Sequence, residues 1–395
     1  MQITWEGEMK EATESPARSI TNNNFLSNEA AAPPASSFDR RLFPLQTENY
    51  PYTIELNDVL KLRPEEYQER FSEGISFHTV GDTGGDGETG YASSINARER
   101  VVDGMKKGVS NKALAFFYHL GDVVYEVPKE LPDQYARRYE NQFYEPFKNY
   151  DKPIFAVPGS HDTQADYLQA FCDNFCNPNN RKKVIGDVQL VGEQPNFYWR
   201  LRMPFANIIG LSTNSPMKGD IDEQQTDWFV EMLKSCRSDD KALIVAMYYS
   251  PLDSEPGGGG SNGSPWLYRL TNEAYRKSKI FPHLVLSGHW HAYQRVNVTR
   301  QNGEQTVHVI AGCGGKEPLY GVTLPPNTSD RLFDGTTATM AKTFALEEVG
   351  SDLDRHGFME ISIDAQHITA RFISTDKDNT ERDRFVINIR TRKIE

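Results

Sequence analysis

The sequence predicts an α/β fold, more closely an α+β sandwich, in which two mixed β-sheets pack together and are flanked by helices. From residue 71 onward, short continuous apolar runs alternate with stretches of helical character, which is typical of sheets covered on at least one face. From about residue 357, apolar and polar residues alternate as in antiparallel strands. Two packed sheets accommodate both patterns.

The segment before this pattern has a different composition. Residues 1–49 are rich in Ser, Asn, Ala and Pro and show no periodicity. Such a segment buries too little apolar area to offset its ordering entropy. We therefore expect a polar, partly disordered extension over residues 1–49 and one catalytic domain over residues 50–395, ending in antiparallel strands.

Individual elements follow from the same patterns. The predicted strands of the first part are Ile75–Val80, Ala113–Leu120, Pro153–Val157, Asn207–Leu211, Ala242–Met247 and Leu284–Leu286. The predicted helices between them are Ser94–Lys107, Pro132–Tyr144, Glu223–Lys234 and Thr271–Lys277. The predicted antiparallel strands at the end are Phe358–Ile363, His367–Ile373 and Arg384–Ile389.

Composition excludes several classes of partner. A net charge of −12 and a pI near 5.3 argue against a nucleic-acid-binding surface. No apolar run reaches the roughly 18 residues of a membrane span, and the N-terminus lacks the apolar core of a signal peptide. The four cysteines form no disulfide framework, and the Cys172–Cys176 spacing favours a buried helical turn over a metal site. We expect a soluble, cytoplasmic protein.

Four of the predicted strands end in Gly followed by polar residues. This places polar side chains at one rim of the sheets, where α/β active sites lie. A Gly-Asp pair alone is a common turn, but His-x-His is stronger because alternate residues of an extended segment point the same way. In order, the four blocks are Gly81-Asp82, Gly121-Asp122, Gly159-Ser160-His161-Asp162 and Gly288-His289-Trp290-His291.

This ordered set resembles the calcineurin-like metallophosphoesterases, and its second block resembles the purple acid phosphatase branch. In that branch a tyrosine three residues after the aspartate is a metal ligand, which corresponds to Tyr125. The wider family has a ligand His two residues after the first Asp, where this chain has Gly84. The two departures compensate each other. The resemblance spans roughly residues 71–395, including the strand end Ala311–Gly315 and His356-Gly357-Phe358.

The resemblance implies a first metal site formed by Asp82, Asp122, Tyr125 and His291. Oxygen donors with one imidazole suit Fe(III), and also divalent manganese, iron or zinc. Iron is the expected metal, with manganese or zinc as alternatives.

The second site that the resemblance implies is altered. Asp122 and His289 are present, but Ser160 stands at the family's Asn position and Tyr249 at the position of a His. A neutral hydroxyl is a poor ligand, and a phenol binds well only when it is deprotonated. We therefore favour one metal ion over two. The alternatives are a dinuclear centre in which the second metal ionises Tyr249, or a decayed site in which Ser160 and Tyr249 have no role.

The main functional hypothesis is a hydrolase of a phosphate ester or related small molecule, acting through a metal-bound water. His161 matches the family's histidine beside the leaving group and is the candidate general acid. One alternative is a repurposed single-metal enzyme that catalyses a lyase reaction or rearrangement. The other is an inactive binding homologue. The Gly-rich stretch 256–265 is interpreted as a surface loop or a lid. The sequence predicts neither the substrate nor the oligomeric state.

Overall fold

The structure is a computed structural model of the 395-residue chain. It describes residues 50–85, 92–108, 111–125, 134–163, 168–177, 193–215, 219–237, 240–252, 265–316, 329–331, 335–343, 356–375 and 379–395. The predicted extension, residues 1–49, lies outside the described residues, as does the Gly-rich stretch up to residue 264.

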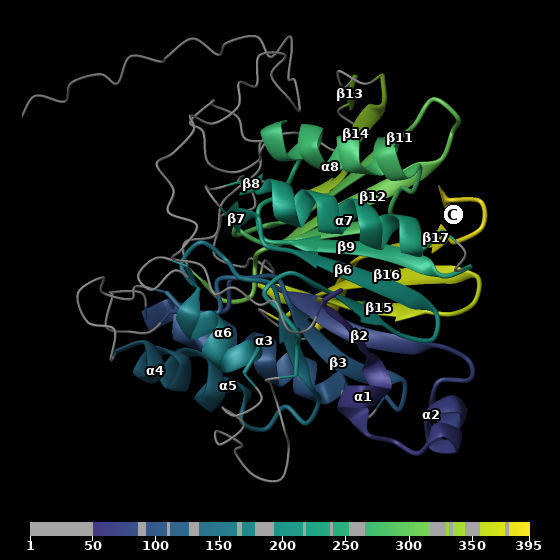
Figure 1. The fold of residues 1–395 in the computed structure, drawn as a ribbon. Helices are drawn as coiled ribbons and strands as arrows, with labels where there is room; N and C mark the ends of the chain where they lie inside the picture. The colour runs from purple at the N-terminus through teal and green to yellow at the C-terminus, as the bar shows by residue number, and fades with distance from the viewer. Residues whose placement is uncertain are drawn as a thin grey trace, which may run out of the picture.

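Two large sheets form the centre of the molecule (Figure 1). The nine-stranded sheet has the order β1 (Thr53–Glu55), β5 (Trp199–Arg202), β6 (Ala206–Leu211), β9 (Ala242–Met247), β10 (Leu284–Ser287), β12 (Gln305–Ala311), β11 (Tyr293–Thr299), β14 (Thr337–Thr343) and β13 (Ser329–Arg331). The seven-stranded sheet has the order β18 (Lys393–Ile394), β17 (Thr380–Asn388), β16 (His367–Ser374), β15 (Gly357–Ile363), β2 (Ile75–Val80), β3 (Leu114–His119) and β4 (Ile154–Ala156). A small sheet pairs β7 (Asn214–Ser215) with β8 (Asp220–Ile221).

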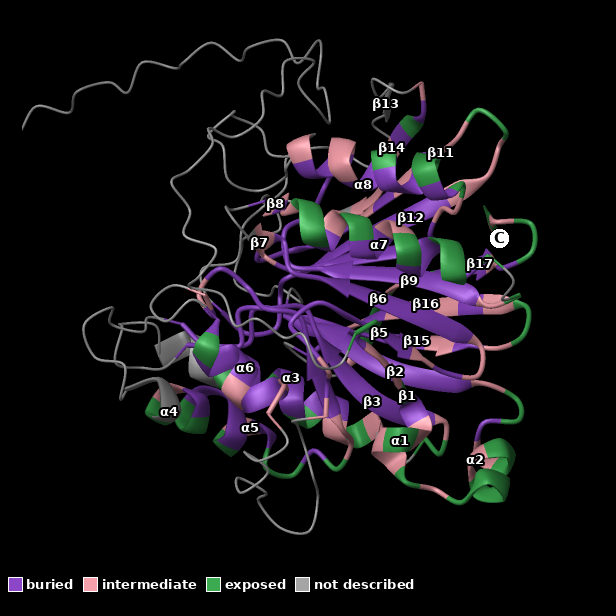
Figure 2. Ribbon diagram, viewed as in Figure 1, coloured by how far each residue is buried: buried purple, intermediate pink, exposed green. Residues whose placement is uncertain are grey.

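Helices cover the outer faces of the two sheets (Figure 1). On the nine-stranded sheet lie α7 (Glu223–Ser235) and α8 (Pro265–Ser278). On the seven-stranded sheet lie α3 (Ala92–Gly108), α4 (Gln134–Tyr139), a π-helical turn (Glu140–Tyr144), α5 (Glu145–Phe147) and α6 (Gln169–Phe175). Two short helices, α1 (Leu56–Leu60) and α2 (Pro64–Arg70), precede β2. Figure 2 shows that the strands between these layers are mostly buried. The predicted sandwich of two mixed sheets is confirmed.

The predicted strands correspond to β2, β3, β4, β6, β9 and β10, within one or two residues at their ends. The structure extends other elements. Helix α8 begins at Pro265, six residues before the predicted start at Thr271. Strand β17 begins at Thr380, before the predicted Arg384, because its polar first residues pair with β16 and Asp383 accepts hydrogen bonds from Arg295. The hairpin of β11 and β12 was not predicted.

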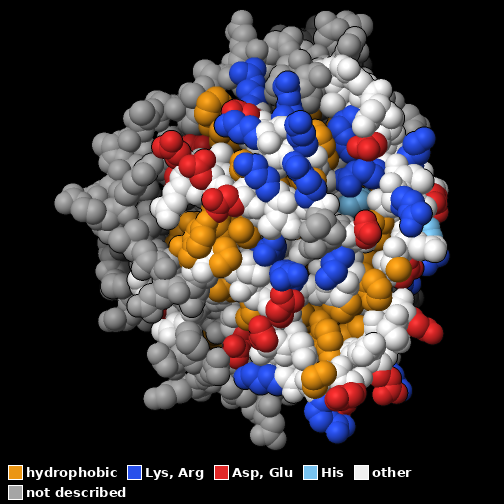
Figure 3. All heavy atoms as spheres, turned by 45° about the vertical axis from the view of Figure 1, so that its right-hand side comes forward, with side chains coloured by type: hydrophobic (Ala, Val, Ile, Leu, Met, Phe, Trp, Pro, Cys, Tyr) orange, Lys and Arg blue, Asp and Glu red, His pale blue; other side chains and the backbone are white. Residues whose placement is uncertain are grey.

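The four cysteines are free thiols. Cys172 and Cys176 lie one helical turn apart at α6, as predicted, but Cys176 is half-buried whereas Cys172 is buried. None of the helices within the described ranges is both long and apolar enough to span a membrane. The net negative charge is unevenly distributed. Figure 3 looks toward the right-hand side of Figure 1 and shows Lys and Arg side chains gathered over the upper part of that face.

The parallel strands decide where a site can form. Strands β2, β3 and β4 run parallel in one sheet, and β6, β9, β10 and β12 run parallel in the other. Their carboxyl ends meet at one rim, where the Gly81 amide donates to the Ala311 carbonyl across the two sheets at 2.9 Å. All four Gly-containing blocks follow strands that end at this rim, as expected.

Candidate metal centre

Three of the predicted ligand residues have backbone conformations that residues other than glycine rarely adopt. The φ angles are +60° at Asp82, +52° at Asp122 and +67° at His289. Residues with a Cβ are strained in this left-handed region, and such strain is concentrated at functional sites. Each of these residues turns the chain immediately after a strand end. Of the nine such residues among the described positions, these three gather at one rim.

Asp82, Tyr125 and His291 bring three donor atoms together. The Tyr125 hydroxyl donates to Asp82 Oδ1 at 2.8 Å and lies 3.1 Å from His291 Nε2. His291 Nε2 is 3.5 Å from the same Asp82 oxygen. Ligand atoms that bind one metal at about 2.0–2.2 Å are separated by roughly 2.8–3.6 Å in octahedral or tetrahedral geometry, so this triangle fits a single cation.

Asp122 lies beside this triangle. Its Oδ1 accepts a hydrogen bond from the His161 backbone amide at 2.8 Å, and its Oδ2 accepts one from the Tyr248 hydroxyl. Burial, followed by the negative charge of Asp82, raises the pKa of the Asp122 carboxyl. Two buried carboxylates that repel each other favour a cation between them.

Tyr125 is fully buried in this negative environment. Burial, with the charges of Asp122 and Asp82, raises the pKa of Tyr125 well above its usual value. Two groups pack on its ring. The Lys316 ammonium lies 4.7 Å from the ring centre, and the His161 ring centre is 4.4 Å away. Lys316 was not predicted, although it directly follows the strand end Ala311–Gly315.

At the positions of the second metal, the structure brings together Ser160, His289 and Tyr249. The His289 ring packs 4.2 Å from the Tyr249 ring, centre to centre. The side chain that reaches among the predicted ligands is nevertheless Tyr248, whose hydroxyl contacts Asp122, His289 and Ser160. The Tyr249 hydroxyl is buried close to the Ser160 side chain, but no hydrogen bond of good geometry joins it to the described part of the chain.

Further residues that were not predicted hold the loops in place. The Asp162 carboxylate accepts from the backbone amides of Gly159 at 2.8 Å, Val123 at 3.1 Å and Val124 at 3.2 Å. Burial, followed by the Asp122 charge, raises the pKa of Asp162. The Gln142 side-chain oxygen accepts from the amides of Gly85 and Tyr125, both at 2.8 Å. The block Gly-Ser-His-Asp contained a signal for Asp162, since its last residue is an acceptor at a turn.

The donor set depends on Tyr125. Counting only His, Cys, Asp and Glu among the residues that the structure describes, no group of three is arranged to hold a metal. With the phenol included, Asp82, Tyr125 and His291 converge and Asp122 lies alongside. The residues therefore fit one cation at the first position.

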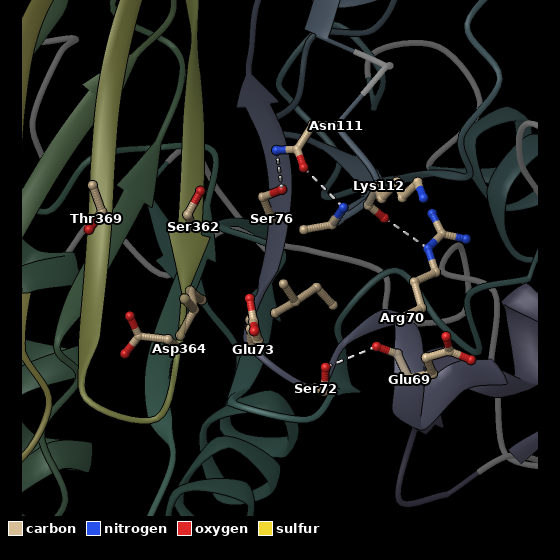
Figure 4. Close-up of a pocket in the computed structure, with 14 residues that line it drawn as sticks. Glu69, Arg70, Ser72, Glu73, Ser76, Asn111, Lys112, Ser362, Asp364 and Thr369 are labelled. Atoms are coloured by element: carbon tan, nitrogen blue, oxygen red, sulfur yellow. Dashed lines mark hydrogen bonds between the residues drawn. The ribbon is translucent and has the colours of Figure 1, made fainter. Parts of the chain in front are cut away.

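The cavity in Figure 4 lies away from this rim, at the opposite ends of the strands. It has a volume of about 420 Å³ between α2 and the amino end of β2. Two of its polar lining residues are hydrogen-bonded within the protein, since Arg70 donates to the Lys112 carbonyl at 3.0 Å and Asn111 donates to Ser76 at 3.2 Å (Figure 4). It adds nothing to the candidate centre.

Comparison with known proteins finds one matching family model. The model of the calcineurin-like phosphoesterase family matches residues 75–293, more than half of the chain. The matched segment contains Asp82, Asp122, Tyr125, His161 and both histidines of the Gly-His-x-His block. No curated protein sequence matches the chain.

Solved structures share the fold at low sequence identity. A purple acid phosphatase from yellow lupin (Lupinus luteus) seeds has 16% identity and a TM-score of 0.54, covering 80% of this chain and 54% of that one. GAP50, described as the anchor in the inner membrane complex of Plasmodium, has 16% identity and a TM-score of 0.52, covering 80% and 89%. PhoD has 12% identity and a TM-score of 0.50, covering 82% and 71%.

Proposed function

The chain belongs to the calcineurin-like phosphoesterase family, and from that premise we propose that it is a metal-dependent hydrolase of a small phosphate ester with a single metal site. The observation that carries the proposal is the convergence of the Tyr125 hydroxyl, Asp82 Oδ1 and His291 Nε2 within 3.5 Å of one another. Asp122 completes the set as the fourth ligand.

Iron is the proposed metal. Carboxylate and phenolate oxygens with one imidazole suit Fe(III), with manganese or zinc as alternatives. The fold shared with a purple acid phosphatase supports this choice. When bound, the metal supplies Lewis-acid chemistry: it activates water as the nucleophile and polarises the phosphate ester.

The chain's own residues then divide the remaining work. Asp82, Asp122, Tyr125 and His291 hold the metal. His161 donates a proton to the departing oxygen of the ester, which is the role of a general acid. Two contacts support this assignment: the His161 amide is bound to Asp122 Oδ1, and its ring packs on Tyr125 beside the ligands. His161 is also only half-buried, so that a substrate can reach it.

A second candidate function is a non-hydrolytic reaction of a small molecule on the same single metal. Ser160 and Tyr249 replace two ligands of the second metal, and this favours the second candidate. In phosphate ester hydrolysis two metals hold both the attacking and the leaving oxygen, and a single metal loses this advantage. A third is a binding role without catalysis; the Plasmodium protein of the same fold is described as an anchor.

A phosphatase screen separates these functions. The purified chain is assayed on a panel of phosphate monoesters and diesters after loading with iron, manganese or zinc, beside Asp122→Asn. Turnover that requires metal and is lost in Asp122→Asn supports the hydrolase. Metal binding without turnover of any ester favours the second function. If Asp122→Asn restores the phenotype of a cell that lacks the protein as well as the wild type does, both enzyme functions are rejected and a binding role is favoured.

A further inference from the structure

The Tyr248 phenol oxygen lies among the side chains at the second-metal positions. The Tyr248 hydroxyl donates to Asp122 Oδ2, lies 3.0 Å from His289 Nδ1 and lies 3.4 Å from Ser160 Oγ. It is also 3.5 Å from Asp82 Oδ1. These neighbours include the two strong ligands, Asp122 and His289, that a second cation would need. The Tyr248 hydroxyl occupies the space in which Asp122 and His289 would both have to contact a second cation.

The hydrogen-bonding capacity of a phenol matches these neighbours. A phenol has one proton to donate and oxygen lone pairs that accept. Tyr248 donates its proton to the Asp122 carboxylate, which leaves the oxygen to accept from His289 when Nδ1 carries a proton. Asp122 and His289 are therefore satisfied by a protein group in place of a metal.

Packing holds the Tyr248 ring in this position. The residue is almost completely buried, and a Cβ added to Gly121 would meet the ring at 2.5 Å. Gly121 has a φ of +99°, which also favours glycine, and it directly precedes Asp122. The absence of a side chain at Gly121 thus makes room for Tyr248 beside the carboxylate that it contacts.

We propose that the Tyr248 hydroxyl takes the place of the second metal, so that this chain is built as a mononuclear enzyme. The proposal rests on the proposed metal-dependent function and deepens it. It also changes the interpretation of Ser160 and Tyr249. Their substitution weakens the ligand set, but the group that excludes the second metal is the neighbouring Tyr248.

The test restores a second-site ligand at position 160 and compares metal binding in the presence and in the absence of Tyr248. Ser160→Asn supplies the amide oxygen at the altered position, and Tyr248→Leu is added to it. Leucine keeps apolar packing near Gly121 but ends short of the carboxylates. The matched control is Ser160→Asn with Tyr249→Leu, which removes the neighbouring buried phenol instead. Bound Mn²⁺ per chain is measured by equilibrium dialysis, and circular dichroism verifies that each variant is folded.

We expect one Mn²⁺ per chain in the wild type, in Ser160→Asn and in the control with Ser160→Asn and Tyr249→Leu. We expect two Mn²⁺ ions only in the double variant with Ser160→Asn and Tyr248→Leu. A folded form of that double variant that still binds one ion would overturn the proposal. If that variant does not fold, Ser160→Asn with Tyr249→His decides, because it restores both ligands with Tyr248 in place. It is expected to bind one ion, and two would overturn the proposal.

The metal content of the wild type separates a failure of the Tyr248 proposal from a failure of the proposed function. Two tightly bound Mn²⁺ ions in the wild type would overturn the role of Tyr248 and leave a metal-dependent hydrolase. A wild type that binds no Mn²⁺, iron or zinc would overturn the proposed function itself, and the role of Tyr248 with it.

Discussion

The Tyr125 hydroxyl lies 2.8 Å from Asp82 Oδ1, although the two residues follow different strands and are 43 positions apart in the sequence. This contact links the two departures from the wider family pattern. Gly84 stands where a ligand histidine is usual, and the Tyr125 phenol reaches the aspartate of the same block.

Asp122→Asn should weaken metal binding and reduce turnover together. The amide keeps the shape of the side chain but loses the charge that a buried cation requires. We expect metal affinity to fall by at least the roughly 10- to 100-fold typical of losing an outer-shell partner. Metal content after dialysis measures this, with the exposed Asp151→Asn as the control. Unchanged metal content would show that Asp122 is not a ligand.

His161→Gln should slow the reaction without releasing the metal. Loss of a general acid typically costs about 10²- to 10⁴-fold, and the loss should be greatest for alkyl phosphates, whose leaving oxygen most needs a proton. The kcat values for an alkyl and a nitrophenyl phosphate are compared in the wild type and the variant. Equal losses on both substrates would contradict the assignment, because a leaving group that needs no proton should be spared.

Asp162→Ala should destabilise the fold. It leaves the amides of Gly159, Val123 and Val124 buried without their acceptor. An unsatisfied buried amide costs about 1–3 kcal/mol, so we expect a loss of about 3 kcal/mol or more. Asp162→Asn keeps one acceptor oxygen and should lose less. Urea unfolding measures both, and equal stability of Asp162→Ala and the wild type would refute the role given to Asp162.

Acid should destabilise the protein in part through His308. Burial, followed by the positive charge of Arg300, lowers the pKa of His308 to about 3. Because an unfolded histidine has a pKa near 6.5, only the unfolded chain binds this proton between those values. The contribution is therefore fully present above about pH 6.5 and decreases as the pH falls, by about 2 kcal/mol between pH 7 and pH 5.

The comparison with His308→Gln isolates this contribution. Carboxyls with a raised pKa, such as Asp162, act in the opposite sense, because the folded chain binds their proton first. The variant's unfolding free energy should therefore depend less on pH than that of the wild type, by the same 2 kcal/mol over this range. Identical pH dependences would contradict a neutral, buried His308.

Much of the fold was predictable because the central strands are continuous buried runs. In β2, β3 and β9 each residue is buried, so the apolar pattern identified each strand and the polar residue after it. The hairpin of β11 and β12 was missed. Strand β11 carries Gln294, Arg295 and Asn297 among its apolar residues, and its pairing with neighbouring strands decides its structure.

The site was less predictable because the path of the chain after each strand end decides which side chain faces the site. Tyr248 and Tyr249 follow β9, where the two-residue alternation of a strand no longer decides which neighbour points inward. The correspondence with the family selected Tyr249, whereas the hydroxyl that reaches Asp122 belongs to Tyr248. Lys316 is likewise brought to Tyr125 only by the folded loop after β12.

The most direct test of the proposed metal centre is the visible spectrum of the protein loaded with Fe(III), measured beside Tyr125→Phe and Tyr248→Phe. A phenolate bound to Fe(III) gives a charge-transfer band, as the resemblance to purple acid phosphatases implies. We expect this band in the wild type and in Tyr248→Phe, and no band in Tyr125→Phe. Iron that binds without such a band, or a band that survives Tyr125→Phe, would contradict this expectation.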